Sequence, residues 1–134
     1  LGGLAIAAAR QPGVRTVIAV DSSSKRLEMA AHNAGLYGVG DRIRWVHGLL
    51  ENCLPLEADV LLLDPPWGGR DYDRREVGLD DLGMPVADVL NAFHGRVLLK
   101  LPKSFLTHVL PGKWTVQPAV DDRGYIKFLL AIRE

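Results

Sequence analysis

The chain has 134 residues, 48% of them hydrophobic, and its 16 Lys and Arg residues balance 16 Asp and Glu residues. These values fit one globular domain, residues 1–134, with a sizeable core. The zero net charge excludes a protein that coats nucleic acid by bulk electrostatics. The single Cys53 excludes an internal disulfide and a cysteine-based zinc site, and no apolar run reaches the roughly 20 residues of a membrane span. Composition therefore predicts a cytoplasmic protein outside the membrane.

Predicted strands and helices alternate along the chain. Apolar periodicity and turn residues predict helices over residues 4–10, 24–37, 86–93 and 104–110, and strands over residues 16–20, 43–46, 60–63, 97–101, 114–120 and 125–132. The last two strands are joined by Asp121–Gly124, which has the composition of a hairpin turn. This order predicts an α/β fold with a doubly wound, mostly parallel sheet and a C-terminal antiparallel hairpin.

An acidic residue ends the first predicted strand. Ligands bind beyond the carboxyl ends of strands in such sheets, and Asp21 stands there, 19 positions after Gly2. A carboxylate at this place can accept the hydroxyl protons of an adenosine ribose. It can equally cap the helix that follows, because three serines come next. Position alone leaves both interpretations open.

A more specific signal follows the strand over residues 60–63, where Asp64-Pro65-Pro66-Trp67-Gly68-Gly69 stands. Two prolines fix φ and remove two N–H donors, so the backbone leaves the sheet along a rigid path. The Asp64 carboxylate and nearby carbonyl oxygens then become acceptors for a planar amine with two hydrogens. Trp67 offers a face on which a base can stack, and the glycines allow close approach to the backbone. The competing interpretation is a proline-rich turn with a half-buried tryptophan.

These residues carry a family resemblance that spans nearly the whole chain. The sequence resembles the class I S-adenosylmethionine-dependent methyltransferases, and within them the trimethylguanosine synthase (RNA cap guanine-N2 methyltransferase) family. The matching segments are Val17–Asp21, Asn33–Gly38, the Pro-Pro-Trp-Gly-Gly turn with Asp71-Tyr72 after it, and Leu101-Pro102-Lys103. The resemblance implies a Rossmann-like fold, S-adenosylmethionine as cofactor, and methyl transfer to an exocyclic base amine of RNA, guanine N2 in the first place.

The resemblance also implies roles for individual residues. We expect catalytic roles for Asp64, Pro65, Pro66 and Trp67, cofactor contacts from Gly2, Gly3, Asp21, Ser22, Leu49 and Leu50, and RNA contacts from Trp67, Gly68, Gly69, Arg70, Tyr72 and Lys103. No metal is expected, because the four histidines show no metal-ligand spacing. The oligomeric state is left open.

Two departures from the family pattern are visible. The family's first motif is a strand and a Gly-x-Gly-Gly turn, whereas this chain begins at Leu1-Gly2-Gly3. We therefore expect an N-terminally incomplete domain whose missing strand is central in the sheet, with strand edges exposed beside the gap. In place of the family's Gly-Asp pair, which receives the adenine amino group, stands Gly48-Leu49, with Glu51 as a possible substitute.

Several alternatives stay open at this point. Arg70, Arg74 and Arg75 suit phosphate contacts at a cleft rim, with Lys100 and Lys103 as further candidates. An adenine-N6 or cytosine-N4 methyltransferase uses a similar Asp-Pro-Pro-aromatic turn, and a non-catalytic RNA-binding relic accommodates both departures. A nicotinamide dehydrogenase explains Asp21 but not the Asp-Pro-Pro-Trp segment.

Overall fold

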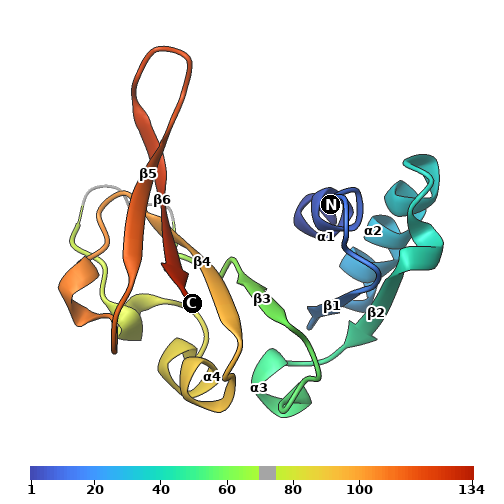
Figure 1. Cartoon of the computed structure of the whole chain (residues 1–134), viewed down its shortest axis with the longest axis horizontal. Coiled ribbons are helices and arrows are strands. Elements are labelled where there is room, and N and C mark those ends of the chain that lie inside the picture. The colour runs from blue at the N-terminus through green and yellow to red at the C-terminus, as the bar shows by residue number, and fades with distance from the viewer. Residues whose placement is uncertain (70–74) are drawn as a thin grey trace. The chain divides into compact units, whose positions relative to one another are not determined.

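A computed structural model describes residues 1–69 and 75–134 of the chain (Figure 1). The chain divides into two units: unit 1 is Leu1–Cys53 and unit 2 is Leu54–Glu134. Among the helices of the described residues, none is long and apolar enough to cross a membrane.

Unit 1 consists of a parallel pair of strands and the helices beside it. Its elements are α1 (Gly3–Ala9), β1 (Val17–Asp21), α2 (Ser24–Leu36), the 3-10 turn η1 (Gly40–Arg42), β2 (Ile43–His47) and α3 (Leu50–Cys53). The register runs from Val17 opposite Ile43 to Asp21 opposite His47.

The core of unit 1 lies on one face of this strand pair. Val17 and Ala19 of β1 stand opposite Ile43 and Trp45 of β2, and side chains two apart on a strand point to the same face. This face packs against the buried residues Ile6 and Ala9 of α1, Ala34 of α2, and Val39 just before η1. Trp45 is thus part of the packing of unit 1.

Unit 2 is built on a four-stranded mixed sheet. Its elements are β3 (Val60–Leu63), η2 (Leu79–Asp81), α4 (Val86–Ala92), β4 (Arg96–Pro102), η3 (Thr107–Val109), β5 (Thr115–Val120) and β6 (Ile126–Arg133). The strand order is β3-β4-β6-β5, in which β3 and β4 are parallel and β6 is antiparallel to both β4 and β5. Figure 1 shows the tip of the β5–β6 hairpin extending beyond the rest of unit 2.

The core of unit 2 follows from the alternation of β4. Val97, Leu99 and Leu101 are fully buried, whereas Leu98 and Lys100 between them are half-buried. On α4, Val86, Val89 and Leu90 are buried at the helical spacing of three and four residues, so the helix contributes one apolar face. Lys100 consequently lies on the face of β4 opposite to Leu99 and Leu101.

The predicted elements are largely confirmed. The Asp121–Gly124 turn is also confirmed, because the Gly124 N–H donates to the carbonyl of Asp121. One expectation was wrong, and one element was missed. The helix over residues 104–110 is only the 3-10 turn Thr107–Val109, and the short helix α3 was not predicted. Propensity is a weak signal for one-turn helices, since packing readily overrides it.

Candidate functional site

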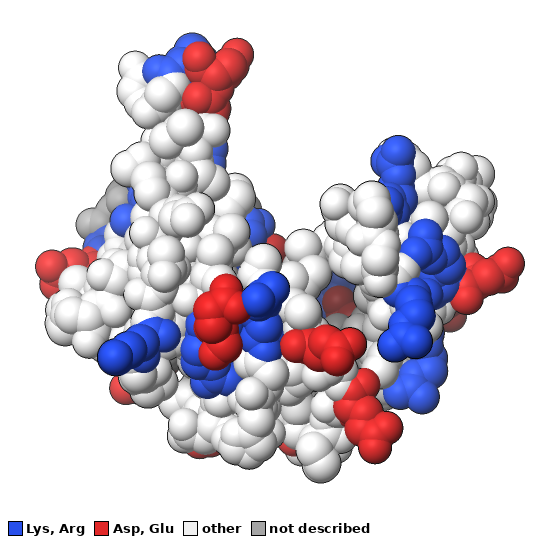
Figure 2. All heavy atoms as spheres, viewed as in Figure 1, with Lys and Arg blue, Asp and Glu red and all other residues white. Residues whose placement is uncertain are grey.

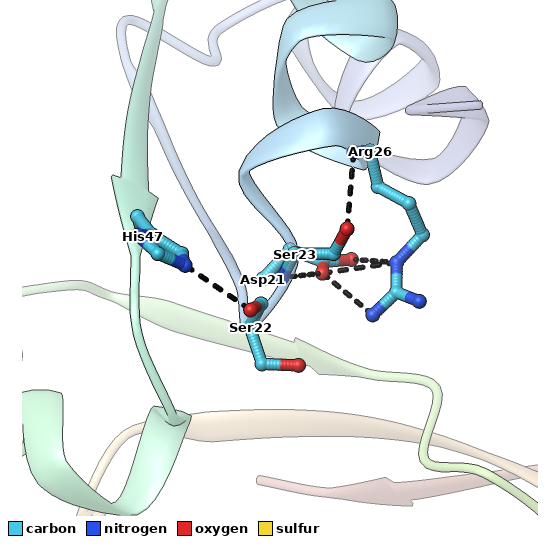
Figure 3. Close-up of polar contacts among 5 residues, drawn as sticks. All are labelled: Asp21, Ser22, Ser23, Arg26 and His47. Carbon is cyan, nitrogen blue, oxygen red and sulfur yellow. Dashed lines mark hydrogen bonds and ion pairs between the residues drawn. The ribbon is translucent and has the colours of Figure 1, made fainter.

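In unit 1 the candidate site is the end of β1, where Asp21 is bound by its own neighbours (Figure 3). Its Oδ1 accepts the backbone N–H of Ser23 at 2.8 Å and the Arg26 Nη2–H at 2.8 Å. The Arg26 Nε–H is 3.0 Å from Oδ1 and 3.1 Å from Oδ2. The Asp21 pKa is lowered, chiefly by the hydrogen bond from Arg26, and burial opposes this effect only in part.

The cap of α2 separates the two interpretations of Asp21. Ser23 is the N-cap residue, because its side-chain oxygen accepts the backbone N–H of Arg26. Asp21 stands two residues earlier and closes a local turn onto the Ser23 N–H. The interpretation of Asp21 as the helix cap was therefore wrong, and Ser23 takes that role.

The Asp21 carboxylate can still receive a ribose. Its side chain is 33% exposed and that of Arg26 is 52% exposed, so the pair lies at the surface. Ionised carboxylates offer about four lone-pair sites, and Oδ2 accepts the Arg26 Nε–H. One hydroxyl fits on Oδ2 beside Arg26, and a second requires that Arg26 turn away. Beside this group, the His47 ring lies 3.1 Å from the carbonyl of exposed Ser22 (Figure 3).

The other expected cofactor residues of unit 1 lie at turns. Gly2 has φ +79°, and a Cβ there would lie 2.7 Å from the Cβ of Ala30, so only glycine fits. Gly3 begins α1, exposed Leu49 precedes α3 and half-buried Leu50 opens it. A hollow of about 340 Å³ in unit 1 is lined by residues of α1 and α2 and by Leu1, Arg10 and Tyr37 beside them, and Asp21 is not among its lining residues.

In unit 2 the candidate site is the turn after β3. Asp64 is exposed, Pro65 is buried and Trp67 is half-buried. The Pro66 carbonyl accepts the Gly83 N–H at 2.9 Å, which ties the turn to the segment before α4. Gly68 has φ +79°, and a Cβ there would lie 2.6 Å from Arg75 Nη2 and 2.8 Å from the Asp81 carbonyl oxygen. The turn is therefore fixed by the Gly83 hydrogen bond and packed closely against Arg75 and Asp81, so Gly68 cannot be replaced without strain.

Lys100 joins this turn from the neighbouring strand. Its Nζ donates to Asp64 Oδ2 at 2.9 Å. The same ammonium lies 5.1 Å from the centroid of the Trp67 ring and 5.1 Å from that of Phe128. Unit 2 thus brings together a carboxylate, an ammonium and two aromatic rings beyond the end of β3.

The remaining residues predicted to contact the substrate lie around this turn. Exposed Lys103 directly follows β4, and Gly69 has φ +98° with open space around it. Arg75, a predicted phosphate ligand, instead pairs with Asp81 at 2.8 Å. Three other predicted residues, Arg70, Tyr72 and Arg74, and with them Asp71, lie outside the described residues.

The sequence analysis did not predict two of the residues around these carboxylates, Arg26 beside Asp21 and Phe128 beside Lys100. Arg26 stands five residues after Asp21 on the first turn of α2, a spacing that the sequence shows and that could have indicated the pair. Phe128 gave no signal, because it reaches Lys100 only through the pairing of β4 with β6. Cys53 is half-buried, and the described residues contain no cluster of three metal-ligating side chains.

This architecture, with acids at the ends of parallel strands, is that of the class I methyltransferases. A solved domain of a putative precorrin-6Y C5,15-methyltransferase from Corynebacterium diphtheriae has the same fold, with a TM-score of 0.63 at 16% identity over 98% of this chain and 82% of that one. Residues 1–110 match the RNA cap guanine-N2 methyltransferase family, and the chain belongs to it. The predicted fold class and family are confirmed, and S-adenosylmethionine is the cofactor of this class.

Two curated relatives share part of the sequence. The ribosomal protein uL3 glutamine methyltransferase of Bordetella pertussis is 46% identical over 67 residues, which are 49% of this chain and 22% of that protein. An uncharacterized RNA methyltransferase of Gloeobacter violaceus is 33% identical over 90 residues, 66% of this chain and 19% of that protein. The chain therefore spans about a fifth of the length of these relatives.

Proposed function

We propose that this protein transfers a methyl group from S-adenosylmethionine to an exocyclic amine of a base in RNA, with guanine N2 as the first candidate. The observation that carries the proposal is the turn after β3. It presents the exposed carboxylate of Asp64 next to a rigid Pro65-Pro66 step and the Trp67 ring. Membership of the RNA cap guanine-N2 methyltransferase family supports the same acceptor.

The chemistry asks little acid–base help from the protein. S-adenosylmethionine supplies an electrophilic methyl group, so the chain mainly has to provide position and electrostatics. Asp64 and the Pro65 carbonyl accept the two hydrogens of the amine and aim its nitrogen lone pair out of the ring plane. Trp67 stacks the base, which is worth about 1–3 kcal/mol. After transfer, the amine proton leaves to Asp64 or to water.

Unit 1 supplies the cofactor contacts in this proposal. Asp21 receives the ribose hydroxyls, Gly2 and Gly3 approach the methionine part, and Ser22, Leu49 and Leu50 flank the nucleoside. The free acceptor capacity of Asp21 Oδ2 and the surface position of the Asp21–Arg26 pair support this assignment. For the RNA side we assign Trp67, Gly68, Gly69, Arg70, Tyr72 and Lys103.

A second candidate acceptor is the side-chain amide of a protein glutamine. It is favoured by the 46% identity with the uL3 glutamine methyltransferase. A glutamine amide is also a planar NH₂ group, so Asp64 and the Pro65 carbonyl can hold it in the same way. It offers no ring to stack on Trp67, which is why we rank the base amine first.

The first test is calorimetric binding of S-adenosylmethionine and S-adenosylhomocysteine. We expect saturable binding by the full-length protein, and a loss of at least tenfold in Asp21→Ala. Asp122→Ala, on the exposed hairpin turn, is the matched control and should bind like the unmodified protein. A well-folded protein that binds neither compound contradicts the enzyme proposal and leaves an RNA-binding relic.

The second test identifies the acceptor. Total RNA and total protein are incubated separately with the enzyme and S-adenosylmethionine labelled in the methyl group. We expect label in RNA, and nuclease digestion with mass spectrometry should place it on guanine N2. Label on adenine N6 or cytosine N4 would correct the base, and label on glutamine in the protein fraction would establish the second candidate. Asp64→Asn should lower transfer about a hundredfold and leave cofactor affinity within twofold.

A further inference from the structure

The amino ends of β1 and β2 form an end of unit 1 that the proposed ribose contact does not use. Val17 and Ile43 open the two strands and stand opposite each other, whereas Asp21 closes β1 at its carboxyl end. At about 3.3 Å per residue, the first and last residues of β1 are about 13 Å apart. A ligand at the amino ends therefore leaves the Asp21 carboxylate free.

Helices α1 and α2 end on this side of unit 1. Each helix leads into one strand of the parallel pair, so its last residues lie near the amino end of that strand. Arg10 follows α1 and Tyr37 follows α2. The Arg10 guanidinium lies 5.7 Å from the centroid of the Tyr37 ring, and Tyr37 is 60% exposed. The two helix ends thus meet in a stacked pair that is open to solvent.

Three more arginines lie where the chain enters the two strands. Arg15 comes shortly before β1, Arg42 directly precedes β2, and Arg44 is the second residue of β2. The Arg42 Nη2–H donates to the carbonyl of Val14, which joins the start of β2 to the connection before β1. Arg44 stands opposite Ile18, the second residue of β1. Because of this register, the arginines of the two connections gather at one end of the strand pair.

The charge at this end is mainly positive. Residues 10–16 and 37–44 contain four arginines and one acid, Asp41. Within the described part of the chain, the ion pair of unit 1 joins Arg26 to Asp21, at the other end of β1. The four arginines have no carboxylate partner in that part of the chain. Guanidinium groups in this state are well suited to phosphate oxygens, which they bind through paired N–H donors.

A hollow beside Tyr37 offers room for a flat group. Its wall on α1 is a stripe that runs from Gly3 through Ile6 and Ala7 to Arg10, and its other wall includes Asn33 and Tyr37, one helical turn apart. Its volume of about 340 Å³ is within the size range of ligand sites. Single-stranded nucleic acid is bound by this combination of aromatic rings, on which bases stack, and basic groups along the backbone.

We propose that the amino-end surface, defined as Arg10, Arg15, Tyr37, Arg42 and Arg44, binds a single-stranded segment of RNA. The arginines contact its phosphates, and one base stacks at Tyr37. The inference rests on the proposed function, which makes RNA the partner, and it adds a binding surface apart from the cofactor carboxylate. RNA affinity and cofactor affinity consequently depend on different residues of unit 1.

The test measures binding of a short fluorescent oligouridylate to the full-length protein by anisotropy at several salt concentrations. In the double variant Arg15→Gln/Arg44→Gln we expect about tenfold weaker binding at about 0.1 M salt. The slope of log affinity against log salt concentration should become shallower by about 1.4, because each lost phosphate contact contributes about 0.7. Tyr37→Ala should weaken binding by about fivefold or more without changing the slope, because stacking involves no counterions.

Controls separate these effects from lost stability and from the total charge. Lys25→Gln/Lys113→Gln removes the same charge from two exposed positions outside the amino-end surface and should bind RNA within twofold of the unmodified protein. Arg42 is left in place, because its hydrogen bond to Val14 supports the fold. Thermal melts establish that each variant is folded, and the affinity for S-adenosylhomocysteine should stay within twofold in all of them.

The outcomes distinguish the inference from the function on which it rests. If Arg15→Gln/Arg44→Gln leaves the affinity and the salt slope unchanged, the inference is overturned, even where the protein methylates RNA. Binding to phosphatidylserine vesicles without binding to the oligouridylate overturns it as well, because the surface then serves a membrane. If the variants lose RNA affinity as expected but the unmodified protein transfers no label to RNA, the surface stands and the methyl-transfer function fails.

Discussion

Two carboxylates in this molecule stand at the carboxyl ends of parallel strands and have different partners: Asp21 is the last residue of β1, and Asp64 directly follows β3. Asp21 in unit 1 is held by Ser23 and Arg26, which lie two and five residues further along the chain. Asp64 in unit 2 is held by Lys100, 36 residues away on the neighbouring strand. The first carboxylate is therefore oriented by local sequence, and the second by strand register and aromatic neighbours.

The surroundings of the two carboxylates also differ in charge. Unit 1 carries six Lys and Arg residues against four Asp and Glu, whereas unit 2 carries ten against twelve. Figure 2 shows basic side chains gathered over the visible face of unit 1, and acidic and basic side chains intermixed over unit 2. A neutral chain can thus still offer a locally basic surface to an anionic ligand.

The largest expected effect is on the free energy of unfolding, and it comes from weakening the core packing between β3 and β4, the two strands that bring Lys100 to Asp64. Leu99 is fully buried and stands opposite Leu63. Leu99→Ala should lower the free energy of unfolding by about 2–5 kcal/mol, because it leaves a cavity under β3 and β4. Chemical denaturation measures this change. Ile126→Ala, at a 45% exposed position of β6, should cost clearly less, and equal costs would contradict the assigned core.

The turn after β3 offers a matched pair of glycines. Ala at either Gly68 or Gly69 must adopt a positive φ, which costs about 1–2 kcal/mol. Only at Gly68 does the added Cβ also collide, at 2.8 Å from a backbone oxygen of Asp81. Gly68→Ala should therefore destabilise the protein more than Gly69→Ala in thermal melts. The reverse order would show that the segment ending at Asp81 does not support the turn.

The local anchoring of unit 1 is tested at the helix cap. Ser23→Ala removes the acceptor for the Arg26 N–H and should cost about 1 kcal/mol. Ser24→Ala, one residue later and inside α2, is the control and should be close to neutral. Denaturant midpoints for the two variants measure the difference. Similar losses would mean that the cap hydrogen bond contributes little to α2.

Arg26 occupies acceptor positions on Asp21 that a ribose needs. Exposed ion pairs contribute about 0.2–1 kcal/mol, so freeing Asp21 in Arg26→Met should tighten S-adenosylmethionine binding by up to about fivefold. Calorimetry measures the change, with Lys25→Met as a control of equal charge. Weaker binding in Arg26→Met alone would show that the arginine itself contacts the cofactor.

The smallest expected effect is on the pH dependence of the unfolding free energy at acidic pH. The Asp21 pKa is lowered in the folded protein, mainly by Arg26, so the ionised form stabilises the fold above the ordinary value of 3.8. This contribution is lost as the pH falls below 3.8 through the lowered folded pKa. The unfolding free energy of Arg26→Met should therefore depend less steeply on pH in this range than that of the unmodified protein. Parallel curves would contradict the assignment.

The sequence by itself determined most of the fold and the identity of the key acids. Strands over 60–63 and 97–101 are visible as short apolar runs, because their period and length depend on neighbouring residues only. Asp21 and Asp64 are visible in the sequence as the acids that end strands, and the diproline next to Asp64 predicts a turn there. The family resemblance depends on these same local segments.

Only the tertiary structure decided which groups act on those acids. That Lys100 meets Asp64, and Phe128 meets Lys100, depends on the register of β3 with β4 and of β4 with β6. A shift of one residue in the strand register would turn Lys100 to the opposite face of the sheet. The residue types alone do not indicate this register. The sequence alone therefore predicts the turn after β3 as a candidate site, and the strand pairing brings Lys100 and Phe128 to it.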